Sequence, residues 1–258
     1  MKFSLITINY NNVSGLEKTI KSVFAQNYFS IDEFEYIIID GGSTDGSVEL
    51  IKKYAAEPDS KIFKWVSEKD SGIYNAMNKG IRLSSGSIIG LLNSGDEALP
   101  EAYKNILELH KKNPEAILYG GMNMMQDGRF VKIYSFGADD LPKQMIAHPA
   151  SFVPKAVYEK YGFYDESFRS SGDWDLFVKF FKSGIKFIYT NEIYVNFDCS
   201  GISNSNEKLV VREDKQIIKK YGLKTRKQKL MDIYKILTFI IPGIFLYPVK
   251  KFLGSRIK

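Results

Sequence analysis

The stretch Asn93-Ser94-Gly95-Asp96 follows a short apolar run, Ile88 to Leu92, with the length and composition of a buried β-strand. Ligands of open α/β sheets bind in the crevice outside the carboxyl ends of the strands. A carboxylate at that point, next to a glycine, suits a divalent cation that carries a phosphate. The alternative is structural, because the same residues are also typical of a turn or of a cap for the helix predicted near Pro100.

Two earlier apolar runs end in similar polar loops. Asn9-Tyr10-Asn11-Asn12 follows the run from Phe3 to Ile8, and the loop from Asp40 to Gly46 follows the run from Phe34 to Ile39. If these runs are neighbouring parallel strands, both loops lie on one rim, where a nucleotide would bind. Alternatively, the second loop is an ordinary βα connection in which Ser43 or Asp45 caps the next helix.

A further segment that could contact a ligand runs from Lys69 to Gly80. Ile73, Met77 and Ile81 are spaced for one buried helical face, and Asn78 lies just off that face. Gly80 within a helix costs about 1 kcal/mol relative to alanine. An asparagine in such a helix, directed at the rim, is a candidate ligand contact.

Two carboxylates, Asp173 and Asp175, begin a helix that Leu176, Phe177 and Phe180 would bury. They are two residues apart, about 200° around a helix, so they cannot both face one site. An acid at a helix N-terminus is also favoured by the helix dipole alone. His148, one of two histidines, is either a ligand of a metal or acceptor or a hydrogen-bonding loop residue.

The elements that must position these groups alternate along the chain. Strands are predicted at 3–8, 34–39 and 63–66, with helices at 14–26 and around Val48 to Tyr54 between them, which is typical of a parallel, doubly wound sheet. Further along, the apolar spacing predicts helices at 100–113, 155–161 and 207–221 and strands at 117–119 and 130–136.

Composition narrows the class of protein. The chain has 258 residues, of which 44% are hydrophobic, and a net charge of +6. Residues 224–258 hold nine basic residues and one acid, a net +8, which leaves −2 for residues 1–223. A nucleic-acid-binding protein is therefore not expected. The single cysteine, Cys199, excludes an intramolecular disulfide, and the strand pattern beginning at Phe3 leaves no room for a signal peptide, so a cytosolic location is predicted.

The basic tail contains an uncharged run, 236–249, interrupted by Pro242 and Pro248. It has 14 residues, whereas a spanning helix needs about 20. With basic residues on both sides, it is predicted to lie on an anionic membrane surface. A helix packed on the core or on a partner subunit is the alternative.

Taken together, the motifs resemble those of family 2 glycosyltransferases with the GT-A fold. The likeness covers roughly residues 3–200, and it is closest to bacterial enzymes that build exopolysaccharide, capsule or lipopolysaccharide units. It implies an α/β fold with a Rossmann-like, mostly parallel central sheet flanked by helices. It also implies a catalytic domain at 1–205, with a nucleotide-sugar half at about 1–98 and an acceptor half at about 99–205. Residues 206–258 would form a helical, membrane-associating extension.

The resemblance also implies roles for individual residues, with Mn²⁺ or Mg²⁺ as the cofactor. Asp96 matches the metal-coordinating acid of the family's DxD signature, and Asp173 matches the catalytic base. Trp174 and His148 are possible contacts of the acceptor or the metal. Residues expected to bind the nucleotide-sugar donor are Asn9, Tyr10, Asp40, Asp70, Asn78, Ser94 and Gly95.

Three departures from the family pattern involve four positions. Gly41 stands where many members have an acid that contacts uracil, so the base of the donor stays open. Met77 replaces a frequent arginine before Asn78. Asn93 and Gly95 replace the earlier acids of the DxD signature, so the donor's phosphates would complete the metal's shell.

The predicted activity follows from these roles. A base and a metal ligand without a carboxylate nucleophile imply a single displacement that inverts the anomeric carbon. We therefore expect an inverting glycosyltransferase that moves a sugar to a hydroxyl of a glycan or lipid-linked acceptor, at the cytoplasmic face of the inner membrane. The alternative is a non-catalytic nucleotide-sugar-binding scaffold with the same fold. A nucleotidyltransferase is less favoured, because no glycine- and lysine-rich phosphate loop occurs near the N-terminus.

Overall fold

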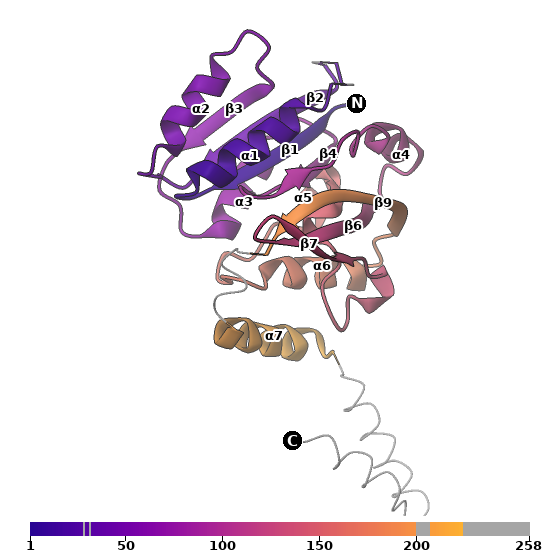
Figure 1. The fold of residues 1–258 in the computed structure, drawn as a ribbon. Helices are drawn as coiled ribbons and strands as arrows, with labels where there is room; N and C mark the ends of the chain where they lie inside the picture. The colour runs from indigo at the N-terminus through magenta and orange to yellow at the C-terminus, as the bar shows by residue number, and fades with distance from the viewer. Residues whose placement is uncertain (28, 31, 200–206, 224–258) are drawn as a thin grey trace, which may run out of the picture. The chain divides into compact units, whose positions relative to one another are not determined.

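The computed structural model describes residues 1–27, 29–30, 32–199 and 207–223. Contacts group Met1–Tyr221 into one compact unit and Gly222–Lys258 into a second. The strands of the described residues form one nine-stranded sheet in the order β3-β2-β1-β4-β8-β6-β9-β5, with β7 paired to β6 (Figure 1).

The N-terminal half confirms the predicted doubly wound arrangement. Strands β3, β2, β1 and β4 are parallel neighbours, so their carboxyl ends lie on one rim. Helices alternate with these strands along the chain. The elements are β1 (Phe3–Asn9), α1 (Val13–Phe24), β2 (Phe34–Asp40), α2 (Ser47–Ala55), β3 (Ile62–Ser67), α3 (Ile73–Leu83) and β4 (Ile88–Leu91).

The two faces of this half are covered by different helices. Alternate strand residues such as Phe3 and Leu5 pack with α1 and α2 in the main core cluster. The opposite face receives α3, whose Gly80 lies so close to β1 that an added Cβ would come within 2.4 Å of Ile6 Cγ2. Close packing of α3 on the sheet therefore explains a glycine inside a helix, despite its cost of about 1 kcal/mol.

The C-terminal half of the sheet is mixed. Strand β8 runs antiparallel to both β4 and β6, and β6 is parallel to β9. The elements are β5 (Glu97–Ala98), α4 (Ile106–Lys112), β6 (Ile117–Gln126), β7 (Arg129–Tyr134), η1 (Ala138–Asp140), η2 (His148–Ala150), β8 (Ser151–Pro154), α5 (Lys155–Tyr161), α6 (Gly172–Lys182) and β9 (Phe187–Asp198).

The helix predicted at 100–113 is shorter than expected. Residues 100–105 form turns, and α4 begins only at Ile106. Two contacts with β9 and one backbone conformation account for this. Ala98 pairs with Val195, Leu99 N donates to Tyr194 O, and Glu101 has a left-handed φ of 55° that a helix cannot accommodate.

Helix α7 (Glu207–Tyr221) forms where the sequence predicts it, but it belongs to the first compact unit. The contacts extend this unit to Tyr221, and the predicted division of the chain at 205/206 stays a prediction. Buried Glu213 and Ile217 fasten α7 to that unit. The predicted apolar segment 236–249 lies outside the described residues. Within the described part of the chain, no helix is long and apolar enough to cross a membrane.

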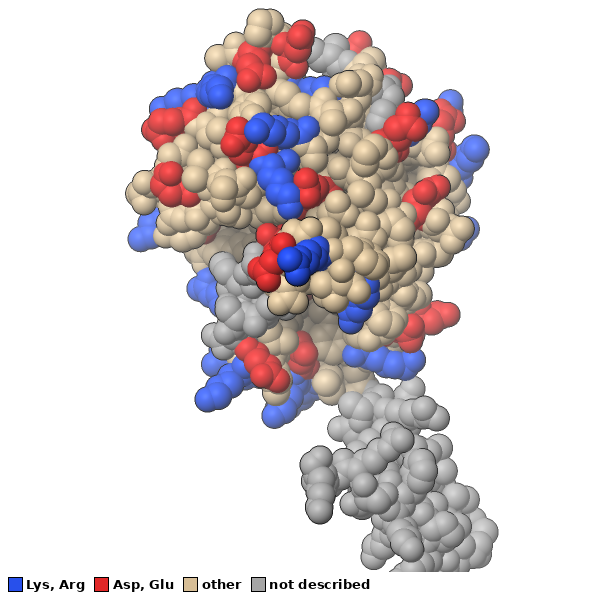
Figure 2. Space-filling view, in the orientation of Figure 1, with Lys and Arg blue, Asp and Glu red and all other residues tan. Residues whose placement is uncertain are grey.

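Charges are mixed on the face of the molecule drawn in Figure 2. Acidic and basic side chains lie interspersed among neutral ones, and no single sign dominates the described residues in that view. This distribution agrees with the near balance of charge in residues 1–223.

Candidate active site

The rim at the carboxyl ends of β1 and β2 is organised around Asp40. Asn9 and Asp40 are opposite each other in the β1–β2 register, and Asn9 Nδ2 donates to Asp40 Oδ1 at 2.8 Å. Asp40 is fully buried, and its two oxygens accept five hydrogen bonds in all. The other donors are the amides of Gly42 and Ser43 and the hydroxyls of Ser43 and Ser67.

These bonds decide the ionisation of Asp40. Burial by itself raises the pKa of the carboxyl, but the hydrogen bonds from Ser43, Ser67 and Asn9 outweigh it and hold the pKa below its ordinary value. The carboxylate therefore stays charged and fixes the loop, and its predicted contact with the donor would have to be made through that loop. Tyr10 is 63% exposed beside it.

Gly41 brings the Tyr10 ring and the Asp70 carboxylate together. A Cβ added at Gly41 would lie 2.6 Å from Asp70 Oδ2 and 3.2 Å from Tyr10 Cδ2. Asp70 is itself held in place, since its Oδ1 accepts from Gly72 N at 2.9 Å. Two predicted donor-binding side chains from different loops thus lie next to each other, and the absence of a side chain at position 41 makes that possible.

The turn after β4 is anchored to α1 by Thr19. The Thr19 hydroxyl donates to Asp96 O at 2.7 Å and accepts from Gly95 N at 3.0 Å. Gly95 has a φ of 105°, which favours glycine, and Ser94 O accepts from Asn12 Nδ2 at 3.1 Å. The sequence did not single out Thr19, because its bonding partners lie 76 and 77 residues away.

Asp96 is 3% exposed, with two differently placed carboxylate oxygens. Its Oδ1 accepts from Asp198 N at 2.9 Å, whereas its Oδ2 is buried without a hydrogen-bond partner in the described structure. Burial, reinforced by the nearby Asp198 carboxylate, raises the pKa of Asp96 to about 8. Asp96 is therefore largely protonated at neutral pH.

The surroundings of Asp96 bear on the predicted metal. No group of three or more His, Cys, Asp or Glu residues able to hold a metal occurs in the described part of the chain. The buried, unpartnered Oδ2 of Asp96 and the adjacent Asp198 carboxylate nevertheless fit a divalent cation that takes its other oxygens from a diphosphate. Such a cation has to displace the Asp96 proton and reach an oxygen that is closed to solvent.

The side chain of Asn78 is bonded to the segment that precedes α6. Its Nδ2 donates to Tyr164 O at 3.0 Å and to Glu166 Oε1 at 2.9 Å, and its Oδ1 accepts from Tyr164 N at 3.0 Å. Asn75 donates to the other oxygen of Glu166 at 2.8 Å. Both amide hydrogens of Asn78 are used in this way, so the predicted sugar contact would require these bonds to rearrange.

Asp173 lies at the start of α6, half-buried, next to Tyr74 of α3. The Tyr74 hydroxyl donates to Ser170 O at 2.6 Å, accepts from Gly172 N at 2.8 Å and lies 3.4 Å from Asp173 Oδ1. Burial raises the pKa of Asp173 above its ordinary value, opposed by His148. A carboxyl of raised pKa is a stronger proton acceptor than an ordinary one, which suits a general base.

The two possible acceptor contacts are both buried. His148 Nε2 bonds to the Tyr164 hydroxyl at 2.8 Å, and burial lowers the pKa of His148, with Asp173 opposing the shift. Trp174 is 6% exposed, and its indole nitrogen donates to Leu141 O at 2.7 Å. His148 therefore lies beside Asp173, whereas the indole N–H of Trp174 is bonded to the loop before η2.

A model of the glycosyl transferase family 2 matches residues 4–152, more than half of the chain. The chain belongs to this family. Glycosyltransferase is accordingly the activity class of the protein, and the motifs that predicted it are those of β1, β2, α3 and the turn after β4.

Two curated relatives of this glycosyltransferase are mycobacterial proteins. An uncharacterized glycosyltransferase of Mycobacterium tuberculosis is 34% identical over 185 residues, which cover 68% of this chain and 67% of the relative. A PGL/p-HBAD biosynthesis glycosyltransferase of Mycobacterium bovis is 26% identical over 230 residues, covering 87% and 85% of the two chains.

Solved structures confirm the GT-A fold. S. aureus TarS 1-349 in complex with UDP-GlcNAc has a TM-score of 0.66 at 18% identity, covering 80% of this chain and 61% of that one. Mannosyltransferase PcManGT from Pyrobaculum calidifontis, in complex with GDP-Man and Mn²⁺, has a TM-score of 0.58 at 17% identity, covering 75% and 56%. This glycosyltransferase thus spans about three fifths of the length of the TarS fragment.

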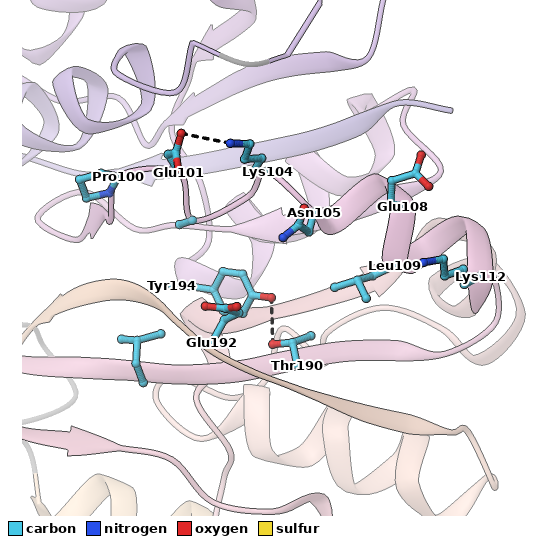
Figure 3. Close-up of a pocket in the computed structure, with 12 residues that line it drawn as sticks. Pro100, Glu101, Lys104, Asn105, Glu108, Leu109, Lys112, Thr190, Glu192 and Tyr194 are labelled. Carbon is cyan, nitrogen blue, oxygen red and sulfur yellow. Dashed lines mark hydrogen bonds and ion pairs between the residues drawn. The ribbon is translucent and has the colours of Figure 1, made fainter.

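A surface pocket of the glycosyltransferase lies elsewhere, between the α4 region and β9 (Figure 3). Its lining carries charges of both signs, including Glu101, which pairs with Lys104 at 3.3 Å. On the opposite wall the Tyr194 hydroxyl donates to Thr190 at 2.9 Å. None of the predicted site residues lines this pocket.

Proposed function

We propose that this family 2 glycosyltransferase transfers a sugar from a nucleoside-diphosphate sugar to a hydroxyl of a glycan or lipid-linked acceptor, with inversion at the anomeric carbon. The observation that carries the proposal is Asp173. Its carboxyl has a raised pKa and lies 3.4 Å from the Tyr74 hydroxyl, which also bonds the backbone at Ser170 and Gly172.

The base performs the step that the acceptor cannot perform alone. A sugar hydroxyl is a weak nucleophile near neutral pH, so Asp173 would take its proton as the new C–O bond forms. The bond between the anomeric carbon and the diphosphate oxygen breaks in the same displacement, and the nucleoside diphosphate leaves. With one base and no carboxylate nucleophile, a single displacement inverts the configuration.

Binding of the donor falls to the rim. Tyr10 offers an exposed ring for stacking on the base, next to the Asp70 carboxylate, and the loop fixed by Asp40 provides backbone groups nearby. Ser94 and Gly95 lie in the turn before Asp96. We propose that these groups, with Asn9 and, after rearrangement, Asn78, hold the nucleotide sugar.

Asp96, with Asp198 beside it, would hold Mn²⁺ or Mg²⁺. When bound there, the metal offsets the negative charge that gathers on the departing diphosphate. The chain's own contribution is to give up the Asp96 proton and to orient the carboxylate by the bond from Asp198 N.

The acceptor and the location are also proposals. The relative named for PGL/p-HBAD biosynthesis supports a lipid-linked or glycan acceptor for this chain. The basic residues around 236–249 support attachment to the cytoplasmic face of an anionic membrane. Deleting residues 224–258 should move the protein from the membrane to the supernatant after fractionation, and unchanged fractionation would refute the attachment.

The reaction is tested by incubating the full chain with UDP-, GDP- and dTDP-sugars, Mn²⁺ and a membrane extract as the source of acceptor. We expect one donor class to yield nucleoside diphosphate and an acceptor-linked sugar of inverted configuration, and EDTA to suppress both. A retained configuration would contradict the single displacement.

A non-catalytic nucleotide-sugar-binding scaffold is the alternative, and the buried, unpartnered Oδ2 of Asp96 is the observation that favours it. It predicts that a donor raises the melting temperature without any turnover.

A further inference from the structure

The backbone of residues 169–172 directly precedes Asp173, and residues of two helices form hydrogen bonds with it. From α3, the Tyr74 hydroxyl binds Ser170 O and Gly172 N. From α7, the Glu213 carboxylate accepts three consecutive backbone amides, with Arg169 N on Oε1 at 2.8 Å and Ser170 N and Ser171 N on Oε2 at 2.9 and 2.8 Å. Glu213 is 2% exposed, so these bonds are shielded from water.

Glu213 of α7 binds the loop before α6 through several hydrogen bonds to one carboxylate. One charged acceptor satisfies three consecutive amides, and hydrogen bonds to a charged group are about twice as strong as neutral ones. Its neighbour Asp214 extends the contact, since it accepts from the Ser171 hydroxyl at 2.8 Å. Three consecutive amides pointing at one carboxylate leave the backbone before Asp173 little freedom to rotate.

A second contact between α6 and α7 provides an internal comparison. Lys220 Nζ binds both oxygens of the buried Asp175 at 2.8 and 2.9 Å. In this pair Lys220 fastens α7 to a side chain of α6, whereas Glu213 bonds the backbone amides of residues 169–171. Loss of Lys220 should therefore loosen α7 without releasing the segment that orients the base.

We propose that Glu213 is a positioning residue of the transfer reaction, which holds the 169–171 backbone so that Asp173 faces the acceptor hydroxyl. The inference rests on the proposed role of Asp173. It also gives α7, which directly precedes the basic tail in the sequence, a role in positioning the base.

The effect expected from this role is on the chemical step. A displacement of about 1 Å in a catalytic group, caused by a change away from the chemistry, can cost about 100-fold in rate. The donor-binding rim is built from other loops, so the affinity for the donor should change little. A residue that acts only on folding would instead lower the number of active molecules without changing the rate of each.

The test compares Glu213→Ala, Glu213→Gln, Glu213→Asp and the control Lys220→Met in the full chain. The turnover number is expressed per donor-binding site, counted by calorimetry with whichever of UDP, GDP and dTDP stabilises the wild type. This count removes the contribution of unfolded protein. Hydrogen exchange of peptides spanning 166–174 reports whether the segment has loosened.

We expect Glu213→Ala to lower kcat by about 10- to 100-fold, with the donor KM within about twofold. Glu213→Asp should recover part of kcat, because it keeps the charged acceptor. Lys220→Met should lower the melting temperature, leave kcat within about twofold and leave exchange at 169–171 unchanged. If Glu213→Ala does not fold, Glu213→Gln carries the test, because it retains the shape and one acceptor oxygen.

Equal kcat per site in wild type and Glu213→Gln, or equal losses in the Glu213 and Lys220 variants, would overturn the inference while leaving the proposed function intact. If instead the wild type shows no transfer and matches Asp173→Asn, the proposed function fails, and the role of Glu213 fails with it.

Discussion

The donor rim and the base segment are built in contrasting ways. Around Asp40, all five hydrogen bonds come from its own loop or from the neighbouring ends of β1 and β3, at most 31 residues away in sequence. The segment before Asp173 is instead held by Tyr74 and Glu213, which lie 42 to 98 residues away. The proposed donor rim is thus held by contacts that are nearer in sequence than those that hold the segment before the proposed base.

This contrast predicts that some single substitutions will lower kcat without changing the affinity for the donor, and that others will weaken donor binding without changing kcat. The largest effect among these is expected for Tyr74→Phe. The change removes the bonds to Ser170 O and Gly172 N and leaves a buried amide unpaired, at a cost of about 1–3 kcal/mol. We expect kcat to fall about tenfold or more, with the donor KM within about twofold, as measured by initial rates.

The matched control is Tyr36→Phe, which also removes a buried tyrosine hydroxyl, bonded to Thr7 at 2.9 Å on the donor side. It should lower stability without lowering kcat. A similar fall in kcat for both variants would show that the position of Tyr74 is not special.

Gly41→Ala is expected to weaken donor binding without affecting the proposed base. Its Cβ would displace the Asp70 carboxylate, which is pinned to Gly72 N, and crowd the Tyr10 ring. We expect the donor KM to rise by up to about tenfold, equivalent to about 1.4 kcal/mol, with little change in kcat. Gly137→Ala is the control, since its Cβ would meet no described atom within 4 Å. An unchanged KM in Gly41→Ala would place the donor elsewhere.

A smaller effect is expected from Asp96→Asn, on the pH dependence of stability. The folded pKa of about 8 lies above the ordinary value of 3.8, so folding retains a proton that the unfolded chain loses. This group's contribution to stability is full below about pH 4 and is lost as the pH rises toward 8. Without metal, the wild type should lose stability from pH 6 to 8.5 more steeply than Asp96→Asn does in urea unfolding. Parallel pH profiles would contradict the raised pKa.

The parts of the fold that the sequence predicts are those that local sequence patterns determine. The alternation that ends in β4 is encoded by apolar periodicity and by polar strand ends, and α5 and α7 lie where helical spacing places them. β8 and β9 were not predicted, because they exist through pairing with β4 and β6, which are distant in sequence. Glu101 shortened a predicted helix for the same reason, since its turn is fixed by contacts with β9.

Some residues of the candidate site are likewise placed by local pattern, and others by contacts that are distant in sequence. Asn9, Tyr10, Asp40 and Asp96 lie at strand ends, where topology alone brings them to one rim. The direction of a side chain needs its partners, however, and Asn78 is directed at Tyr164 and Glu166, which its own helix does not reveal. The sequence did not indicate Tyr74 and Glu213. Tyr74 has the pattern of a core residue, and Glu213 is one of many charged residues on α7.

The most direct test of Asp173 as the base compares the turnover and the donor affinity of Asp173→Asn with those of the wild type. The amide keeps the size and the hydrogen bond from Trp174 N but cannot take a proton. We predict that kcat falls by about 10²- to 10⁴-fold, while the calorimetric Kd for the donor stays within about twofold. Wild-type kcat in this variant, at full donor binding, would show that Asp173 is not the base.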